Sequence, residues 1–271
     1  MQGAELNAMI ELDDRHWWYR GRRRVVTSTL DRLELPVGAE ILDAGCGSGR
    51  TLDDLIRYGS VTGIDPSRSA LDAARARGHS RVFAGHLERL PFEDASFDLV
   101  TCLDVLEHTA SDVVSLRELR RISRPGARLV VTVPAYQLLW SRHDDANLHY
   151  RRYRRGTLRE SANVAGWSVE RTSYFNSLLL PPAALVRLAE RVLPRSRRAR
   201  SDLRLTPRAL DPVLAVPMYA EALLMRAGVK LPAGLSLLAV LVNRPPAGLV
   251  EIEWPLPEPA AAPRAVRQAL G

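Results

Sequence analysis

Three closely spaced glycines and two aspartates mark the part of this sequence best suited to bind a small ligand. In the segment ILDAGCGSGR, Asp43 precedes Gly45, and Gly47 and Gly49 follow at alternate positions. Glycines at this spacing let the backbone turn tightly and approach a ligand closely. Asp65 lies 20 residues after Gly45, where a carboxylate commonly accepts hydrogen bonds from ribose hydroxyls. The segment therefore predicts a nucleotide-type site.

Two details argue against a dinucleotide as the ligand. The dinucleotide fingerprint G-x-G-x-x-G/A would place Gly or Ala five residues after Gly45, but Arg50 stands there and the third glycine comes one residue early. Asp43 at the end of its strand would also repel a pyrophosphate. A carboxylate there suits a ligand with a cationic end, such as the ammonium and sulfonium of S-adenosylmethionine.

Alternating apolar strands and helices must position these residues. Apolar strands alternate with helical patterns, which predicts a parallel sheet covered on both faces. One helix, 111–122, is expected to stop at the Pro125-Gly126 pair. The predicted strands are 39–45, 60–65, 81–85, 96–105, 127–135, 167–175 and 235–243.

Composition limits the setting of the chain. It has 271 residues, 46% of them hydrophobic, a net charge of +7 and two separated cysteines, Cys46 and Cys102. There is no disulfide framework or CxxC zinc motif, so a reducing cytoplasm is the expected compartment. The N-terminus lacks the apolar core of a signal peptide, and no apolar run approaches the roughly 20 residues of a spanning helix. The basic surface favours anionic partners.

We expect four parts along the chain. Residues 1–34 are predicted to form N-terminal cover helices, and 35–173 with 235–245 the α/β core. Residues 174–234, apolar and basic with a helical pattern, are predicted to form a helical lid inserted before the last strand. The tail 246–271, rich in Pro and Ala, is predicted to be disordered.

Taken together, the motifs resemble those of the class I S-adenosylmethionine-dependent methyltransferases, within them the group related to ubiquinone and menaquinone biosynthesis. The resemblance covers about residues 16–243 and implies a Rossmann-like seven-stranded sheet in the order 3-2-1-4-5-7-6 with the last strand antiparallel. The matching segments are LDAGCGSG (42–49), GIDPS (63–67), LERLPFEDASFDLV (87–100), DVLEH (104–108), LRRISRPGARLVVTVPA (119–135) and AGWSVE (165–170).

The resemblance also implies S-adenosylmethionine as the cofactor. The residues expected around it are Tyr19, Asp43, Gly45, Cys46, Gly47, Asp65, Pro66, His86, Leu87 and Leu103. One stretch departs from the family, which often has Gly-Asp-Ala-Glu where this chain has Gly85-His86-Leu87-Glu88. His86 could accept a hydrogen bond from adenine through a neutral ring nitrogen, and the backbone N–H of Leu87 is the alternative.

Methyl transfer to an alcohol or phenol requires alignment and removal of a proton, for which histidine is well suited. The long polar connection after the fifth strand contains HYRRYRR and opens at the ligand-binding edge of the sheet. We expect His149 to be the general base and His143 the second candidate; a histidine that only orders the loop is the alternative. We expect Tyr136, Tyr150 and Arg151 to line the acceptor site.

A metal site is the alternative for the run after the fourth strand. In the ubiquinone O-methyltransferases a related run binds a divalent cation, and here it would consist of Asp104, Glu107 and His108. Hard cations need more oxygen ligands than this run offers. The sequence therefore favours no metal, with Glu107 and His108 fixing the loop through hydrogen bonds.

The acceptor predicted from these features is a small or lipid-linked molecule, methylated on oxygen. Carbon methylation of an activated aromatic ring, or a basic binding module without catalysis, are the alternatives. Nucleic acid is disfavoured because the Asn/Asp-Pro-Pro-aromatic run of amino-group methylases is missing and the pattern places Cys102 in the core. The apolar and basic lid suits a hydrophobic acceptor and peripheral contact with an anionic membrane.

Overall fold

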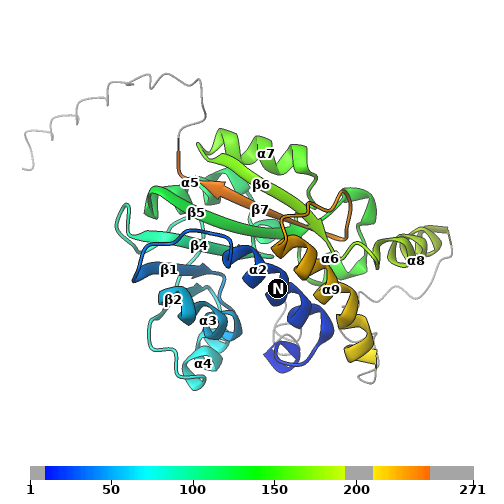
Figure 1. The fold of residues 1–271 in the computed structure, drawn as a ribbon, viewed down its shortest axis with the longest axis horizontal. Helices are drawn as coiled ribbons and strands as arrows, with labels where there is room; N and C mark the ends of the chain where they lie inside the picture. The colour runs from blue at the N-terminus through cyan, green and yellow to red at the C-terminus, as the bar shows by residue number, and fades with distance from the viewer. Residues whose placement is uncertain (1–9, 193–209, 245–271) are drawn as a thin grey trace, which may run out of the picture.

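A single seven-stranded sheet organises the chain (Figure 1). The computed structural model describes residues 10–192 and 210–244. The strand order is β3-β2-β1-β4-β5-β7-β6, which confirms the predicted order. The strands are β1 (Ala39–Ala44), β2 (Gly59–Asp65), β3 (Val82–Ala84), β4 (Phe97–Leu103), β5 (Ser123–Pro134), β6 (Ser168–Phe175) and β7 (Ser236–Val242).

The pairing directions also match the prediction. Strands β1 to β5 pair in parallel, whereas β7 runs antiparallel to both β5 and β6. Every residue of β7 is buried, as expected for an apolar strand inside a sheet that is covered on both faces. The C-terminal ends of β1, β2, β4 and β5 therefore meet at one edge, where open α/β folds bind ligands.

Helices cover both faces of the sheet (Figure 1). Apolar residues of α5 and α7 pack in one core with alternate residues of β5 such as Leu129 and Val131. Val130 points to the opposite core, which contains residues of α2 and α9. The helices are α2 (Trp17–Leu30), α3 (Arg50–Leu55), α4 (Arg68–Ala76), α5 (Asp112–Ile122), α6 (Arg142–Ala146), α7 (Arg155–Val164), α8 (Leu180–Val192) and α9 (Asp211–Arg226), with 3₁₀ turns η1 (Ile56–Tyr58), η2 (Leu106–His108) and η3 (Gln137–Leu139).

The predicted helix 111–122 is confirmed, with Ser111 as its N-cap and its end just before the Pro125-Gly126 pair. Helix α5 ends at Ile122, and β5 starts at Ser123 and continues through the Pro-Gly pair. The pairing with β4 shifts register there, and Gly126 has a φ of +82°. The pair thus marks an irregularity within the strand.

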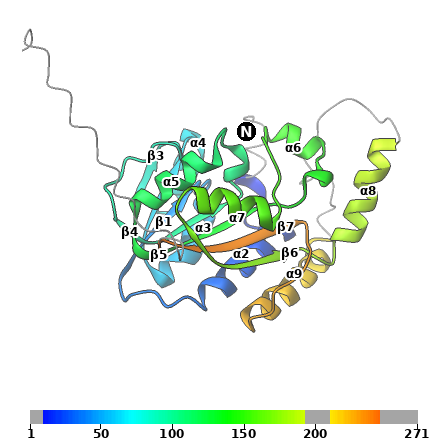
Figure 2. The same ribbon diagram turned by 90° about the horizontal axis from the view of Figure 1, so that it is seen from above.

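The predicted lid consists of two differently placed helices. Helix α9 packs along α2, so it covers the sheet together with the N-terminal helix. Helix α8 projects from the end of the sheet at which β6 ends (Figure 2). Between them, 193–209 lie outside the described residues, as do 1–9 and the predicted tail beyond 244. No helix in the described part is both long and apolar enough to cross a membrane.

Close contact between α2 and α9 depends on Gly21. A Cβ on Gly21 would lie 2.5 Å from Met218 Sδ and 2.8 Å from Met218 Cβ. We expect Gly21→Leu to lower the free energy of unfolding in urea by about 2 kcal/mol or more, because overpacking would force the helices apart. The matched control is Gly156→Leu in α7, where a Cβ would have no neighbouring atom within 4 Å. Equal stability of the two variants would contradict the prediction.

Candidate active site

A cavity of about 990 Å³ opens at the C-terminal edge of the sheet. Its lining includes most of the residues that the sequence predicts around the cofactor: Tyr19, Asp43, Gly45, Cys46, Gly47, Asp65, Pro66 and Leu103. His86 and Leu87 are not in the lining; Leu87 is buried in the core that contains α5. The structure thus brings together the glycine segment and both aspartates, as expected from their strand ends.

The glycine segment is held tightly against its neighbouring strand and turn. The N–H groups of Gly45 and Cys46 both donate to the carbonyl oxygen of Ile64, at 2.8 and 3.0 Å. Gly45 has a φ of +86°, and a Cβ there would lie 2.4 Å from Val105 Cγ2. Only glycine meets both conditions without strain. The backbone itself therefore forms this part of the cavity wall.

Asp65 is oriented by backbone donors at the end of β2. Its Oδ2 accepts from the N–H of Gly47 at 3.0 Å, and its Oδ1 accepts from the N–H of Ser67 at 2.8 Å. Burial raises the pKa of this carboxyl, and the two backbone donors oppose the rise. Each carboxylate oxygen has further lone pairs, so the fixed carboxylate can also accept hydroxyl hydrogens from a ligand in the cavity.

Asp43 is a buried carboxylate at the end of β1. It is 2% exposed, and its Oδ1 accepts from the Thr101 hydroxyl at 2.6 Å. Burial raises the pKa of Asp43 to about 6, although the Thr101 hydrogen bond and the charge of Arg22 act in the opposite direction. A cation in the cavity would stabilise the ionised form.

The N-terminal helix supplies a charged and aromatic wall, of which the sequence indicated the cover and Tyr19 but not the charged residues. Arg22 of α2 forms an ion pair with Asp104 at 2.8 Å, and its guanidinium lies 5.0 Å from the Trp18 ring centroid. Asp13 accepts a hydrogen bond from the Ser48 hydroxyl at 2.6 Å. All of these residues except Ser48 line the cavity. Helix α2 contains several arginines, so the sequence alone does not show which of them faces the cavity.

His149 also lines the cavity and is held by a buried carboxylate. Its Nδ1 lies 2.9 Å from Asp144 Oδ1, and Asp144 is fully buried. Arg152 binds both oxygens of the same carboxylate, at 2.8 and 2.9 Å. Burial acts to raise the pKa of Asp144, but the hydrogen bonds from His149 and Arg152 outweigh it and hold the pKa below its usual value. Asp144 was not among the predicted site residues, although Ser141-x-x-Asp144 is a capping-box pattern and the structure forms that box.

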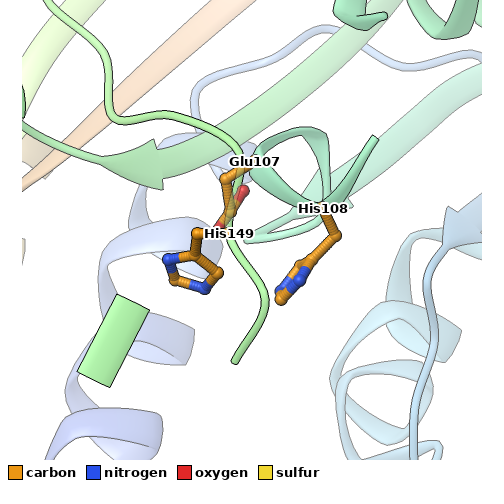
Figure 3. A group of neighbouring side chains, drawn as sticks. All are labelled: Glu107, His108 and His149. Atoms are coloured by element: carbon orange, nitrogen blue, oxygen red, sulfur yellow. The ribbon is translucent and has the colours of Figure 1, made fainter. Parts of the chain in front are cut away.

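Glu107 and His108 of η2 lie beside His149 (Figure 3). The ring centroids of His108 and His149 are 4.6 Å apart, with an interplanar angle of 81°. Burial, together with the neighbouring histidine, lowers the pKa of His108 to about 3, so this ring is neutral at physiological pH. Glu107 is 1% exposed, and burial raises the pKa of its carboxyl well above the usual range. All three residues line the cavity, as does His143.

The three residues predicted to line the acceptor site lie outside the cavity lining. Tyr136 stacks on Tyr174, with ring centroids 5.1 Å apart. Tyr150 is 60% exposed. Arg151 forms an ion pair with Asp112 at 3.2 Å. Within HYRRYRR, the residues that line the cavity are His149 and Arg152.

Residues after β6 complete the acceptor end of the cavity. Asn176 is buried, has a φ of +59° and lines the cavity. Its Oδ1 has no hydrogen-bond partner among the described residues. Four apolar residues in and just before α8 also contribute to the lining: Leu179, Pro182, Ala183 and Val186. This end therefore combines an apolar wall with isolated polar groups.

Cys102 of β4 is sealed inside the protein. Its relative exposure to solvent is 0%, and burial raises the pKa of its thiol well above the ordinary value. The prediction that Cys102 is a core residue is confirmed. A thiol held in this way does not act as a nucleophile.

The strand order, the glycine segment and the two carboxylates match the class I S-adenosylmethionine-dependent methyltransferases. The residues fit that ligand: Asp43 can face its cationic end, and the oriented Asp65 can accept from ribose hydroxyls. Residues 42–131 match the model of the methyltransferase domain family.

Known proteins support the assignment. A probable S-adenosylmethionine-dependent methyltransferase of Mycolicibacterium smegmatis is 32% identical over 169 residues, which cover 59% of this chain and 63% of that protein. A demethylmenaquinone methyltransferase of Beutenbergia cavernae is 39% identical over 106 residues, covering 38% and 44%. The chain thus spans less than two thirds of the length of these relatives. A methyltransferase of Haloferax volcanii, solved in complex with the Trm112 activator, shares the fold with a TM-score of 0.59 and 23% identity, over 89% of this chain and 94% of that one.

Proposed function

We propose that the protein transfers a methyl group from S-adenosylmethionine to a hydroxyl oxygen of a small-molecule or lipid-linked acceptor. The observation that carries this proposal is one cavity whose lining contains Asp43, Asp65 and also His149, the histidine held by Asp144. The methyl donor supplies an electrophilic carbon on a sulfonium. The acceptor oxygen forms the new C–O bond, the electron pair of the broken C–S bond remains on sulfur, and the hydroxyl proton leaves.

Different residues of the cavity bind the donor and act on the acceptor. Asp43 and Asp65 hold the donor by charge and hydrogen bonds. His149 assists the loss of the acceptor proton, because Asp144 fixes its ring in the wall of the cavity. His143 lies in the same cavity, with its ring centroid 6.0 Å from that of His149, and is the second candidate.

The class of acceptor follows from the wall formed by α8. Leu179, Pro182, Ala183 and Val186 favour an acceptor with a large apolar part, and the Asn176 side chain can bind a single polar group on it. Exposed Leu185 on α8 and the basic charge of the chain support peripheral contact with an anionic membrane, from which a lipid-linked acceptor would enter.

An activated aromatic ring methylated on carbon is the second candidate, since one similar protein is named for demethylmenaquinone. Such a reaction also needs alignment and removal of a proton. It uses the same residues, so the acceptor atom must be determined chemically.

Labelled S-adenosylmethionine tests the proposal directly. Calorimetry first measures binding of the donor; a protein that does not bind it would be no methyltransferase. The protein is then incubated with methyl-labelled donor and fractionated cell extract, with Asp43→Asn as the matched control. We expect label in the lipid or small-molecule fraction, released as methyl iodide by hydriodic acid, which cleaves methyl ethers. Label that stays on the acceptor after this treatment would indicate carbon methylation, and label in nucleic acid would contradict the proposal.

A further inference from the structure

We propose that Glu107, His108 and His149 bind one divalent transition-metal ion in the wall of the cavity, next to the acceptor end. The proposal deepens the proposed function, on which it rests, by stating how His149 assists loss of the acceptor proton. One potential ligand atom from each of the three residues lies within 4.8 Å of the others. Figure 3 shows Glu107 and His108 extending from η2 and His149 from the adjacent loop, with the three side chains turned toward the same region.

Glu107 gives the strongest physical reason for an ion. Its side chain is almost completely buried, and its Oε2 has no hydrogen-bond partner in the part of the chain that the structure describes. An unsatisfied polar atom costs free energy when buried, and a buried carboxylate costs more unless it is paired or coordinates a metal. A cation bound between this carboxylate and the two histidines, which each offer a ligand atom within 4.8 Å of one of its oxygens, would stabilise the buried group.

The two histidines are set up as ligands. Asp144 accepts a hydrogen bond from His149 Nδ1, which places the proton on that nitrogen and leaves Nε2 as the ligand atom. Metal-binding histidines commonly have such a carboxylate partner. Arg152 and the capping box of Ser141 in turn hold Asp144. The His108 ring packs against that of His149, with ring centroids 4.6 Å apart, and imidazole nitrogens are common metal ligands.

The donor set identifies the class of ion. Two imidazole nitrogens and one carboxylate oxygen suit Zn²⁺, Co²⁺, Mn²⁺ or Fe²⁺ better than Mg²⁺ or Ca²⁺, which prefer oxygen ligands. Asp104, which the sequence placed in the alternative metal run, is engaged elsewhere: it pairs with Arg22 and accepts from the Thr132 hydroxyl at 3.0 Å. The proposed set therefore departs both from that run and from the expectation of no metal, because His149 comes from a distant part of the sequence.

Three protein ligands leave coordination positions open for the acceptor. The acceptor hydroxyl would bind the ion through oxygen, which lowers its pKa as an ion does for bound water. The proton of the acceptor hydroxyl would then pass to His143, which lines the same cavity. The resulting alkoxide or phenoxide oxygen is the nucleophile of the methyl transfer. His149 thus acts as a ligand and His143 as the proton acceptor.

Cobalt binding tests the site without any turnover. Full-length protein freed of metal with a chelator is titrated with Co²⁺ and followed by visible absorption. We expect saturation at one equivalent. His149→Ala and His108→Ala should each weaken Co²⁺ binding by at least about tenfold, and Asp144→Asn by about 10- to 100-fold, as for partners of metal-binding histidines. The matched control is His79→Ala, which removes a histidine that faces Asp53 at 2.8 Å outside the cavity and should leave Co²⁺ binding unchanged.

The outcomes separate the metal site from the proposed function. Calorimetric binding of S-adenosylmethionine to each metal-free variant confirms that the variant is folded. If neither Co²⁺, Zn²⁺ nor Mn²⁺ binds at about 100 µM, or if Co²⁺ binds equally well to His149→Ala, the metal site is wrong. Undiminished labelling of the acceptor in chelator would also overturn it while the proposed function stands. Tight Co²⁺ binding without label transfer in any fraction would overturn the function and leave the metal site in place.

Discussion

Asp43→Asn is expected to weaken binding of S-adenosylmethionine by about 100-fold, because loss of a buried charge opposite a cation costs about 3 kcal/mol. The substitution keeps the shape of the side chain, and the amide oxygen can still accept the Thr101 hydrogen bond seen at 2.6 Å. The effect should therefore come from charge alone. Calorimetric titration at pH 7.5 measures it, and Asp72→Asn, an exposed carboxylate of α4 paired with Arg75, is the control.

The same carboxyl predicts how donor binding depends on pH. With a pKa of about 6, Asp43 is largely protonated at pH 5 and ionised at pH 7. Donor affinity should rise about tenfold over this interval, since the cationic donor favours the ionised form. The α-amino and α-carboxyl groups of the donor keep their charges in most of this window. In Asp43→Asn the affinity should be weak and nearly constant, and a tenfold rise in that variant would contradict the assignment.

Stability should change in the opposite direction. The native state keeps the Asp43 proton up to a pKa of about 6, whereas the unfolded chain releases it near 3.9. The native state therefore binds more protons between these values, and its stability falls as pH rises through the window. This group should contribute a loss of about 1 kcal/mol in the free energy of unfolding between pH 5 and pH 7, absent in Asp43→Asn. Urea unfolding of both proteins at the two pH values measures the difference, in which other titrating groups cancel.

Local backbone chemistry made the donor end predictable. The turn at Gly45 needs a positive φ and leaves no room for a Cβ, so the glycine itself signals the geometry. Asp43 and Asp65 follow the ends of adjacent parallel strands, so the sheet brings them together. The strand order was implied by resemblance and confirmed by the pairing.

The acceptor end was harder to predict because it is made of irregular segments. In a strand, period two says which side chains share a face, but HYRRYRR follows no regular period, so Arg151 and Arg152 could not be told apart. Arg152 binds Asp144, and Arg151 binds Asp112. Asn176 follows β6 in a left-handed conformation that no nearby pattern indicates.

Long-range packing also decided the role of the predicted lid. The sequence contains apolar helical patterns on both sides of 193–209 but does not show where each helix docks. Met218 of α9 lies against Gly21 of α2, so this helix belongs to the sheet cover. Helix α8 contributes to the acceptor wall, together with Leu179 just before it. The close contact that pairs α2 with α9 has no local signature in the sequence.

His149→Ala should lower turnover of the labelled acceptor by about 10²- to 10⁴-fold, the range for loss of a group that assists proton transfer. Its effect on donor affinity should stay within about twofold, or about 0.4 kcal/mol, because the donor is held at Asp43 and Asp65 and not at His149. A fall in turnover without loss of donor binding is the result expected of a residue that acts on the acceptor.

His79→Ala is the matched control for this experiment. Both histidines face a carboxylate, His149 with Asp144 at 2.9 Å and His79 with Asp53 at 2.8 Å, but only His149 lines the cavity. Turnover measured at saturating donor should therefore change little in His79→Ala. Equal losses in the two variants would mean that the His–Asp pairs matter only for folding, and full activity of His149→Ala would exclude it from the reaction. Both variants lose a hydrogen-bonded histidine, but only His149 lines the cavity. The comparison therefore separates the effect of that position from the general effect of removing such a histidine.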